Sequence, residues 1–308
     1  MADIVITEFM DEAAIRDHLA AFNVLYDPQL VDAPEALLAA VAGARGLIVR
    51  NRTQVRGALL AAAPRLAVVG RLGVGLDNID VEACRARGIA VHPATGANDL
   101  SVAEYVITAA LVLLRGAWFA SGAVAAGEWP RQRLMGRELA GKQLGLVGFG
   151  AIARETATRA RALGMTVAGC DPYLPADHAA WAGARRMALD ELLASSDVVS
   201  LHVPLTPETQ RLLNADALAR MKPDAILVNA ARGGVVDEPA LVQALRSGRL
   251  GGAALDVFER EPVDAEAGRL LAGVPNLLLT PHIAGVTVES NVRVSDVTAR
   301  AVAAQLAG

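Results

Sequence analysis

The stretch LGLVGFGAIARETATRARALGMTVAG, residues Leu144–Gly169, decides the fold of this chain. It consists of an apolar run, the glycine turn Gly148-Phe-Gly-Ala-Ile-Ala153, a helical pattern and a second apolar run before Asp171. This order predicts a strand, a tight turn, a helix and a parallel strand. The two glycines let backbone N–H groups approach a pyrophosphate, and the amino end of the helix adds partial positive charge. The stretch therefore predicts a dinucleotide-binding unit in which the small residue Ala153 replaces a third glycine.

The predicted cofactor contacts lie at this turn and at the carboxyl ends of the predicted strands, where open parallel sheets bind ligands. Asp171 follows the second strand, and a carboxylate there accepts hydrogen bonds from a ribose and repels a 2′-phosphate, which favours NAD over NADP. The alternative is a turn residue before Pro172. His202 is better suited to lining the cofactor crevice or filling a polar gap than to performing chemistry. The residues expected to contact NAD here are Gly148, Gly150, Ala151, Ile152, Asp171, His202, Pro204 and Ala230.

Length and composition favour two α/β domains. The 308 residues predict roughly two domains, and 53% hydrophobic with only 4% aromatic residues suits helices packed on parallel sheets. A net charge of −4 without a basic stripe argues against nucleic acid or an anionic membrane as partner. Cys84 and Cys170 lack metal-binding spacing, so we expect reduced packing residues and no metal site. No signal-peptide pattern is visible, and the longest apolar stretch, Tyr105–Leu114, is too short to span a bilayer, so we expect a cytoplasmic protein.

Apolar runs alternate with helical patterns along the rest of the chain, which is typical of doubly wound parallel sheets. In the first lobe the predicted strands are Ile4–Ile6, Val24–Tyr26, Leu47–Val49, Leu66–Val69 and Ile89–Val91. In the second lobe, strands Val198–Leu201, Ala225–Val228, Ala253–Leu255 and Leu277–Leu279 follow the glycine-turn unit. A long helix from Ser101 to Arg115, extending toward Ala126, is expected between the lobes.

Three candidate catalytic side chains follow predicted strands of the second lobe. Arg232 carries a planar guanidinium that can clamp a substrate carboxylate. His282 can exchange a proton, and a neighbouring glutamate would favour its imidazolium form. Spacing does not decide whether Glu261 or Glu259 is that neighbour. The alternative to a catalytic assembly is a set of ordinary surface ion pairs.

Several of these stretches together resemble the D-isomer-specific 2-hydroxyacid dehydrogenase family. The matching motifs are Val147-Gly-Phe-Gly-Ala-Ile152, Asn229-Ala-Ala-Arg-Gly-Gly-Val-Val-Asp237, Ala254-Leu-Asp-Val-Phe258, Glu261-Pro262 and Pro281-His-Ile-Ala-Gly285. The resemblance implies that Arg232 binds the substrate carboxylate, His282 is the acid/base and Glu261 pairs with it. It also implies that Asp256 and His282 lie near the nicotinamide of NAD.

The resemblance implies a layout of two Rossmann-like domains with the active site in the cleft between them. Residues 1–98 with 284–308 would form the substrate-binding domain, and residues 99–283 the NAD-binding domain. The helix from Ser101 and the loop at Trp129 resemble the contact through which family members form homodimers.

Within the family, Leu47–Arg50 and Gly70–Asp80 are similar to members acting on 3-phosphoglycerate, while Asp3–Glu12, Val49–Val55 and His92–Asn98 are more similar to members acting on (S)-3-sulfolactate. A D-configured 2-hydroxy acid with an anionic C3 group is therefore implied, with sulfolactate favoured. Hydroxypyruvate or glyoxylate reduction is an alternative, as is a non-enzymatic NAD-sensing protein. Family members that oxidise formate carry glutamine where this chain has Glu261. The implied substrate contacts are Arg50, Arg52, Arg71, Val74, Gly75, Arg131 (from a partner subunit) and Arg232.

Overall fold

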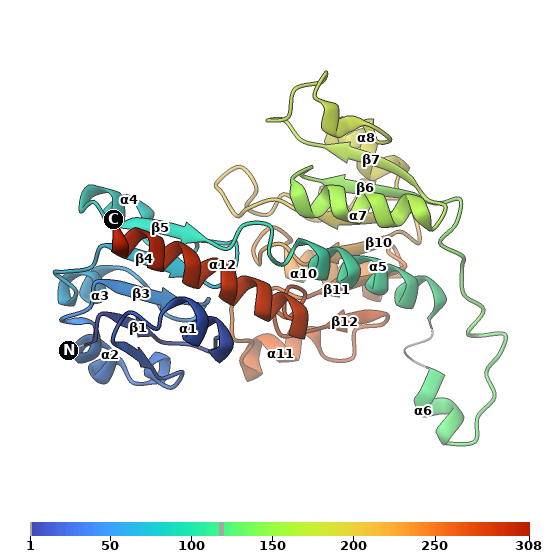
Figure 1. Cartoon of the computed structure of the whole chain (residues 1–308). Helices are drawn as coiled ribbons and strands as arrows, with labels where there is room; N and C mark the ends of the chain where they lie inside the picture. Colours follow the sequence, from blue (N-terminus) through green and yellow to red (C-terminus); the bar gives the residue numbers. More distant parts are fainter. Residues whose placement is uncertain (1, 117–119) are drawn as a thin grey trace. The chain divides into compact units, whose positions relative to one another are not determined.

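The chain forms two compact units, each built on its own parallel sheet. A computed structural model describes residues 2–116 and 120–308, and Figure 1 traces the chain. One unit comprises Met1–Asn98 with Val286–Gly308, and the other comprises Asp99–Gly285. Their sheets have five and seven strands. The prediction of two doubly wound α/β domains is confirmed.

The first unit holds a five-stranded sheet of order β2-β1-β3-β4-β5 in which every pair is parallel. Its strands are β1 (Ile4–Ile6), β2 (Val24–Tyr26), β3 (Gly46–Val49), β4 (Val68–Arg71) and β5 (Ala90–Pro93). Strands β1 and β3 are buried along their whole length. This burial explains their uninterrupted apolar sequence, because helices cover both faces of a parallel sheet.

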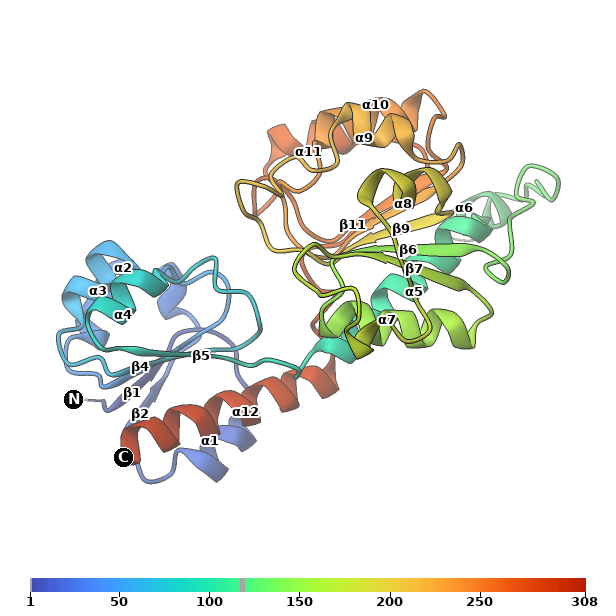
Figure 2. The same cartoon turned by 90° about the horizontal axis from the view of Figure 1, so that it is seen from above.

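Helices cover the two faces of this sheet (Figure 2). On one face lie α2 (Pro34–Val41), α3 (Gly57–Ala62) and α4 (Val81–Ala86), and on the other α1 (Glu12–His18) and the C-terminal helix α12 (Val288–Ala307). A short 3-10 helix, η1, spans Leu30–Asp32. Helix α12 is tied to the first unit because the Asp11 N–H donates to Ser295 Oγ at 3.0 Å and Arg293 Nε donates to the Ala97 carbonyl at 2.9 Å. The last helix therefore returns to the domain where the chain begins.

The second unit holds a seven-stranded parallel sheet of order β12-β11-β10-β9-β6-β7-β8. Its strands are β6 (Gln143–Val147), β7 (Thr166–Cys170), β8 (Arg185–Arg186), β9 (Val198–Leu201), β10 (Ile226–Asn229), β11 (Gly252–Leu255) and β12 (Leu277–Leu279). The strand order reverses between β6 and β9. In a doubly wound sheet such a reversal places a ligand crevice at the carboxyl ends of those two strands.

The helices of the second unit also lie on both faces of their sheet (Figure 2). Helices α5 (Asp99–Arg115) and α7 (Ala151–Ala162) pack on one face, and α8 (Leu189–Ser195), α9 (Ala215–Arg220), α10 (Glu238–Arg246) and α11 (Ala265–Leu271) on the other. A separate helix α6 spans Ala120–Ala125, and a 3-10 helix η3 spans Ala179–Trp181. The expected extension of the long helix past Arg115 crosses residues 117–119, which lie outside the described residues. No helix in the described ranges is both long and apolar enough to cross a membrane.

Candidate active site

The glycine turn has the backbone needed to approach a pyrophosphate. Gly148 has φ +86°, and a Cβ there would lie 2.5 Å from the His202 carbonyl oxygen, so only glycine fits. A Cβ on Gly150 would meet nothing within 4 Å, which leaves open space in front of the turn. Gly150 is also the N-cap of α7 and provides no side-chain hydrogen bond, so the helix amino end is open to an anion. Ala151 and Ile152 begin that helix, and this geometry fits a dinucleotide phosphate.

Asp171 lies at the carboxyl end of β7, close to the glycine turn. One carboxylate oxygen accepts the Phe149 N–H at 2.9 Å, and the other accepts the Tyr173 N–H at 2.9 Å. The second contact is the hydrogen bond of an Asp turn, so Asp171 does stabilise the local loop. Each oxygen retains a further lone pair for a ribose hydroxyl. The turn role and the predicted ribose role are therefore compatible.

His202 follows β9 and faces Ser200, whose Oγ lies 3.0 Å from the ring Nε2. Burial lowers the pKa of His202 to about 4, so the ring is neutral near pH 7. Pro204 and Ala230 also lie at strand ends, after β9 and β10 respectively. A neutral imidazole beside the glycine turn suits the lining of a cofactor site better than proton transfer.

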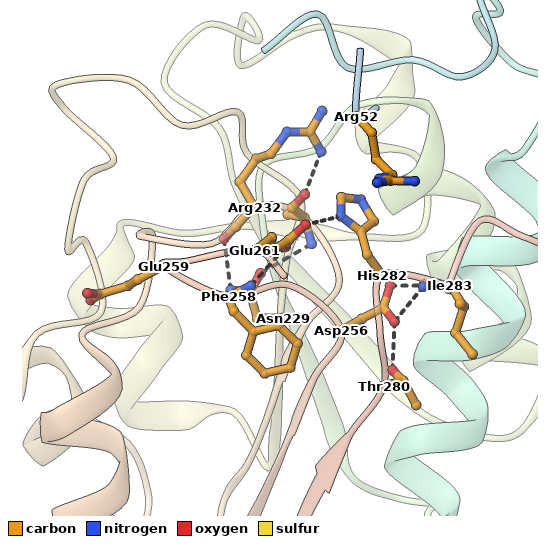
Figure 3. A network of polar contacts seen from close by, with 12 residues as sticks. Arg52, Asn229, Arg232, Asp256, Phe258, Glu259, Glu261, Thr280, His282 and Ile283 are labelled. Carbon is orange, nitrogen blue, oxygen red and sulfur yellow. Dashed lines mark hydrogen bonds and ion pairs between the residues drawn. The ribbon is translucent and has the colours of Figure 1, made fainter. Parts of the chain in front are cut away.

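His282 and Glu261 form a hydrogen-bonded pair (Figure 3). The His282 Nδ1 lies 2.7 Å from Glu261 Oε2, and the other Glu261 oxygen accepts the Phe258 N–H at 3.0 Å. Burial raises the pKa of the Glu261 carboxyl, but the hydrogen bond and charge of His282, with smaller contributions from the Phe258 amide and Arg232, bring the pKa below its usual value. Glu259 instead lies 4.0 Å from Arg211. The histidine is thus held by an ionised carboxylate, with its Nε2 left for a substrate.

Asp256, which is only 1% exposed, holds the loop that carries His282. Its carboxylate accepts the Thr280 hydroxyl at 2.6 Å and the Ile283 N–H at 2.8 Å (Figure 3). It also accepts the Ala284 N–H at 2.8 Å. Its carbonyl accepts the His282 N–H at 2.8 Å. His282 itself has φ +57°, a left-handed conformation that is uncommon outside glycine and needs such support.

The loop that carries Arg232 packs directly against the loop that carries Glu261. A Cβ on Gly233 would lie 1.7 Å from the Phe258 carbonyl oxygen, so the two backbones touch and only glycine is possible there. Asn229 fixes the Arg232 loop, since its Nδ2 donates to the Arg232 carbonyl at 2.9 Å. The structure therefore brings Arg232, Glu261 and His282 together at the carboxyl ends of β10, β11 and β12 (Figure 3).

Sequence reasoning missed Glu238, a nearly buried acid at the start of α10. Its carboxylate accepts the Glu259 N–H at 2.6 Å and so steadies the loop that carries Glu261. Burial raises the pKa of Glu238, and the charges of Glu259 and Glu261 raise it further, although the Glu259 amide opposes this. An acid at a helix amino end has an ordinary explanation in the helix dipole, so the sequence offered no signal for this contact.

In the first unit, a buried acid that sequence reasoning also missed holds the loop after β3. Glu8 is 5% exposed, and its carboxylate accepts the N–H groups of Arg50, Arg52 and Thr53 at 2.9, 3.2 and 3.0 Å. Asn78 binds the same loop from its carbonyl side, because its Nδ2 donates to Thr53 O at 2.7 Å. The Arg50, Arg52 and Thr53 amides are thus occupied.

The two arginines of this loop differ in their surroundings. Arg50 is half-buried, lies over the Phe9 ring at 5.6 Å and donates from NH2 to Asn291 Oδ1 at 2.6 Å. Its buried Nε has no hydrogen-bond partner among the described residues, and burial lowers the pKa of the guanidinium despite the opposing charge of Glu8. Arg52 is exposed and forms an ion pair with Asp32. Of the two, Arg52 is thus paired with a carboxylate, whereas Arg50 donates to a neutral amide.

The remaining predicted substrate contacts lie elsewhere. Arg71 ends β4, and its NH1 donates to the Leu72 carbonyl at 3.0 Å. Val74 and Gly75 follow in the same loop and are half-buried. Arg131 is exposed in the second unit, in the segment after α6. Arg50 and Arg52 thus follow β3 and Arg71 ends the neighbouring strand β4, whereas Arg131 belongs to the other unit.

Comparison with known proteins agrees with this geometry. Residues 107–284 match the family model "D-isomer specific 2-hydroxyacid dehydrogenase, NAD binding domain". The chain is 57% identical to (S)-sulfolactate dehydrogenase of Chromohalobacter salexigens, over 97% of this chain and 96% of that protein. It is 41% identical to D-3-phosphoglycerate dehydrogenase of Mycobacterium leprae over 99% of this chain, which spans 58% of that longer relative.

A solved structure extends the comparison to a bound cofactor. D-lactate dehydrogenase from Aquifex aeolicus, complexed with NAD and lactic acid, superimposes with a TM-score of 0.87 at 28% identity, covering 99% of this chain and 96% of that one. The family model covers the glycine turn, Asp171 and the Arg232–Glu261–His282 group. The predictions of an NAD cofactor and of an oxidoreductase are confirmed. This chain belongs to the D-isomer-specific 2-hydroxyacid dehydrogenase family, and its second unit is the NAD-binding domain.

Proposed function

We propose that the protein interconverts (S)-3-sulfolactate and 3-sulfopyruvate with NAD. The observation that carries this proposal is the half-buried Arg50, which donates to the neutral Asn291 side chain and lies in a loop whose Arg50, Arg52 and Thr53 amides are bound by Glu8. A guanidinium in this state suits an anionic group at C3 of the substrate. The 57% identity to a sulfolactate dehydrogenase supports the sulfonate in particular.

His282 acts as the proton-transfer residue in this proposal. In the oxidation, its Nε2 takes the proton of the C2 hydroxyl while the ionised Glu261 stabilises the imidazolium that forms. NAD, when bound, accepts the hydride that leaves C2. In the reverse direction the imidazolium returns the proton to the carbonyl oxygen as C2 is reduced.

Charged side chains hold the substrate in this proposal. Arg232 binds the C1 carboxylate, because its planar fork matches two carboxylate oxygens, and the Val74 and Gly75 amides assist it. Arg50 and Arg71 bind the C3 anion. Arg52 contributes less, because its charge is already paired with Asp32.

The decisive experiment follows NADH formation with racemic sulfolactate, 3-phosphoglycerate, D-lactate and D-glycerate in parallel. We expect the highest kcat/KM with sulfolactate. A preference for 3-phosphoglycerate would support the anion-binding site but assign it a phosphate in place of a sulfonate, in line with the 41% identity to phosphoglycerate dehydrogenase. A preference for D-lactate would refute the anionic site, and no turnover with any acid despite NAD binding would favour an NAD-sensing protein.

We further propose a homodimer formed through the NAD-binding unit and working in the cytoplasm. Apolar side chains with large exposed fractions lie on α5, α6 and the segment after α6: Leu111 at 39%, Val124 at 47%, Trp129 at 74% and Met135 at 85%. Such a group of exposed apolar residues suits contact with a second copy. Light scattering should give the mass of a dimer, and Trp129→Glu with Met135→Glu should give a monomer. A monomeric wild type would contradict the proposal.

A further inference from the structure

The hydroxyl of Thr280 lies between Asp256 and a tyrosine on another element. Thr280 Oγ1 donates to Asp256 Oδ1 at 2.6 Å, and the Tyr105 hydroxyl lies 2.6 Å from the same Thr280 oxygen. An ionised carboxylate only accepts hydrogen bonds, so the single Thr280 proton is committed to Asp256. Tyr105 must then be the donor to Thr280. The hydrogen bonds therefore run in one direction, from Tyr105 through Thr280 to Asp256.

Asp256 connects these two hydrogen bonds to the backbone around His282. The carboxylate that accepts the Thr280 proton also accepts the N–H groups of Ile283 and Ala284. The backbone carbonyl of Asp256 accepts the His282 N–H. His282 is therefore flanked on both sides by groups bonded to one side chain. These bonds support its left-handed φ of +57°.

Tyr105 is suited to be the fixed first donor of this row of hydrogen bonds. It lies in the first turns of α5, a 17-residue helix with a largely buried face, and its ring is half-buried. Burial raises the pKa of Tyr105, and the charge of Asp256 raises it further, although the Thr280 hydrogen bond opposes this. The phenol is therefore protonated near pH 7. A donated hydrogen bond also makes the receiving hydroxyl a stronger donor in turn.

We propose that Tyr105 is a positioning residue for His282, acting through Thr280 and Asp256 on the loop that carries the histidine. The inference rests on the proposed role of His282 in proton transfer. Tyr105 touches neither His282 nor Glu261 in this proposal. Its effect is to keep the ring where it meets Glu261 on one side and the substrate hydroxyl on the other.

Hydrogen exchange tests the proposal without any turnover. Tyr105→Phe keeps the ring and removes the donor, so we expect faster exchange at the Ile283 and Ala284 amides. The matched control is Tyr26→Phe, which removes a hydroxyl bonded to Met10 in the first unit. The control should leave exchange at the His282 loop unchanged. Unaltered exchange at both amides in Tyr105→Phe would overturn the proposal.

Kinetics give a second readout that a purely structural tyrosine would not change. We expect Tyr105→Phe to lower kcat about 3- to 10-fold with little change in KM for NAD. We also expect the rate of keto-acid reduction to fall off at a lower pH than in the wild type, because a loosened Glu261 contact favours the imidazolium less. Thr280→Ser should keep the wild-type pH profile. Thr280→Val should lower kcat as Tyr105→Phe does. The variant that combines Tyr105→Phe and Thr280→Val should have the same kcat as Thr280→Val alone.

The kinetic outcomes separate the two proposals. A wild type that turns over none of the acids refutes the proposed function, while the exchange measurement still decides the role of Tyr105. An active wild type with an unchanged kcat and pH profile in Tyr105→Phe refutes the positioning role alone.

Discussion

Two loops, one in each unit, are built on the same plan and differ in what they leave free. In the first unit Glu8 accepts the N–H groups of Arg50, Arg52 and Thr53. In the second unit Asp256 accepts two N–H groups and one hydroxyl of the loop around His282. In both, a buried carboxylate after one strand organises the loop after another strand of the same sheet.

The difference lies in the side chains that the loops present. His282 already has its partner, because its Nδ1 meets Glu261 Oε2 at 2.7 Å. Arg50 donates to the neutral side chain of Asn291, and we infer that its positive charge is left for an anion. We propose that the loop of the second unit serves the reaction, which family members share, and the loop of the first unit the choice of substrate.

Removing the histidine should have the largest effect. His282→Ala should lower kcat about 10³-fold with every acid, since general acid–base catalysis contributes about 10²- to 10⁴-fold. Glu259→Gln is the matched control, because that acid lies near Arg211 and not beside His282. Steady-state rates measure both. A loss confined to sulfolactate would mean that this loop selects substrates.

Removing either buried carboxylate should cost similar stability and affect activity differently. Asp256→Ala and Glu8→Ala each leave three donors without an acceptor, and we expect each to lower the free energy of unfolding by about 2–4 kcal/mol. Urea unfolding measures this loss. Asp256→Ala should lower kcat with all substrates, whereas Glu8→Ala should raise KM for anionic ones. The same kinetic change in both variants would contradict the division of roles.

A milder change at Glu8 tests whether this residue affects the choice of substrate. Glu8→Gln keeps one acceptor oxygen and replaces the other by an amide that cannot accept the Arg52 N–H. We expect KM for sulfolactate to rise about 3- to 10-fold, because the loop still folds but holds Arg50 less firmly. The KM for D-lactate should stay the same. Equal increases for both acids would assign Glu8 a general structural role.

The smallest expected effect is on stability at acid pH. The folded pKa of Glu261 lies below its ordinary value of 4.5, so its pairing with His282 stabilises the protein above about pH 4.5 and is lost as pH falls through the folded pKa. In His282→Ala, burial is the largest remaining influence on the pKa of Glu261, so this stabilisation disappears. Melting temperatures between about pH 6 and pH 3 should therefore fall more steeply for the wild type. Parallel curves would show that the pair adds nothing to stability.

Local patterns predicted the fold because parallel strands and their connecting helices leave strong signals. The exceptions are β8, a two-residue edge strand of arginines, and α11, a short helix. The paired glutamate could not be chosen from spacing, since the choice between Glu259 and Glu261 depends on how one loop folds. Glu8 could have been found, because it closely follows β1. Tyr105 could not, since it meets Thr280 across 175 residues of sequence.

The division of roles is tested most directly by comparing wild type and Arg50→Ala on sulfolactate, 3-phosphoglycerate and D-lactate. We predict that Arg50→Ala lowers kcat/KM for the two acids with a charged C3 group about 10- to 100-fold, the loss of roughly one charge-assisted hydrogen-bond contact, and leaves D-lactate nearly unchanged. Equal losses for all three acids would contradict the account, because Arg50 would then support the fold and would not select the substrate.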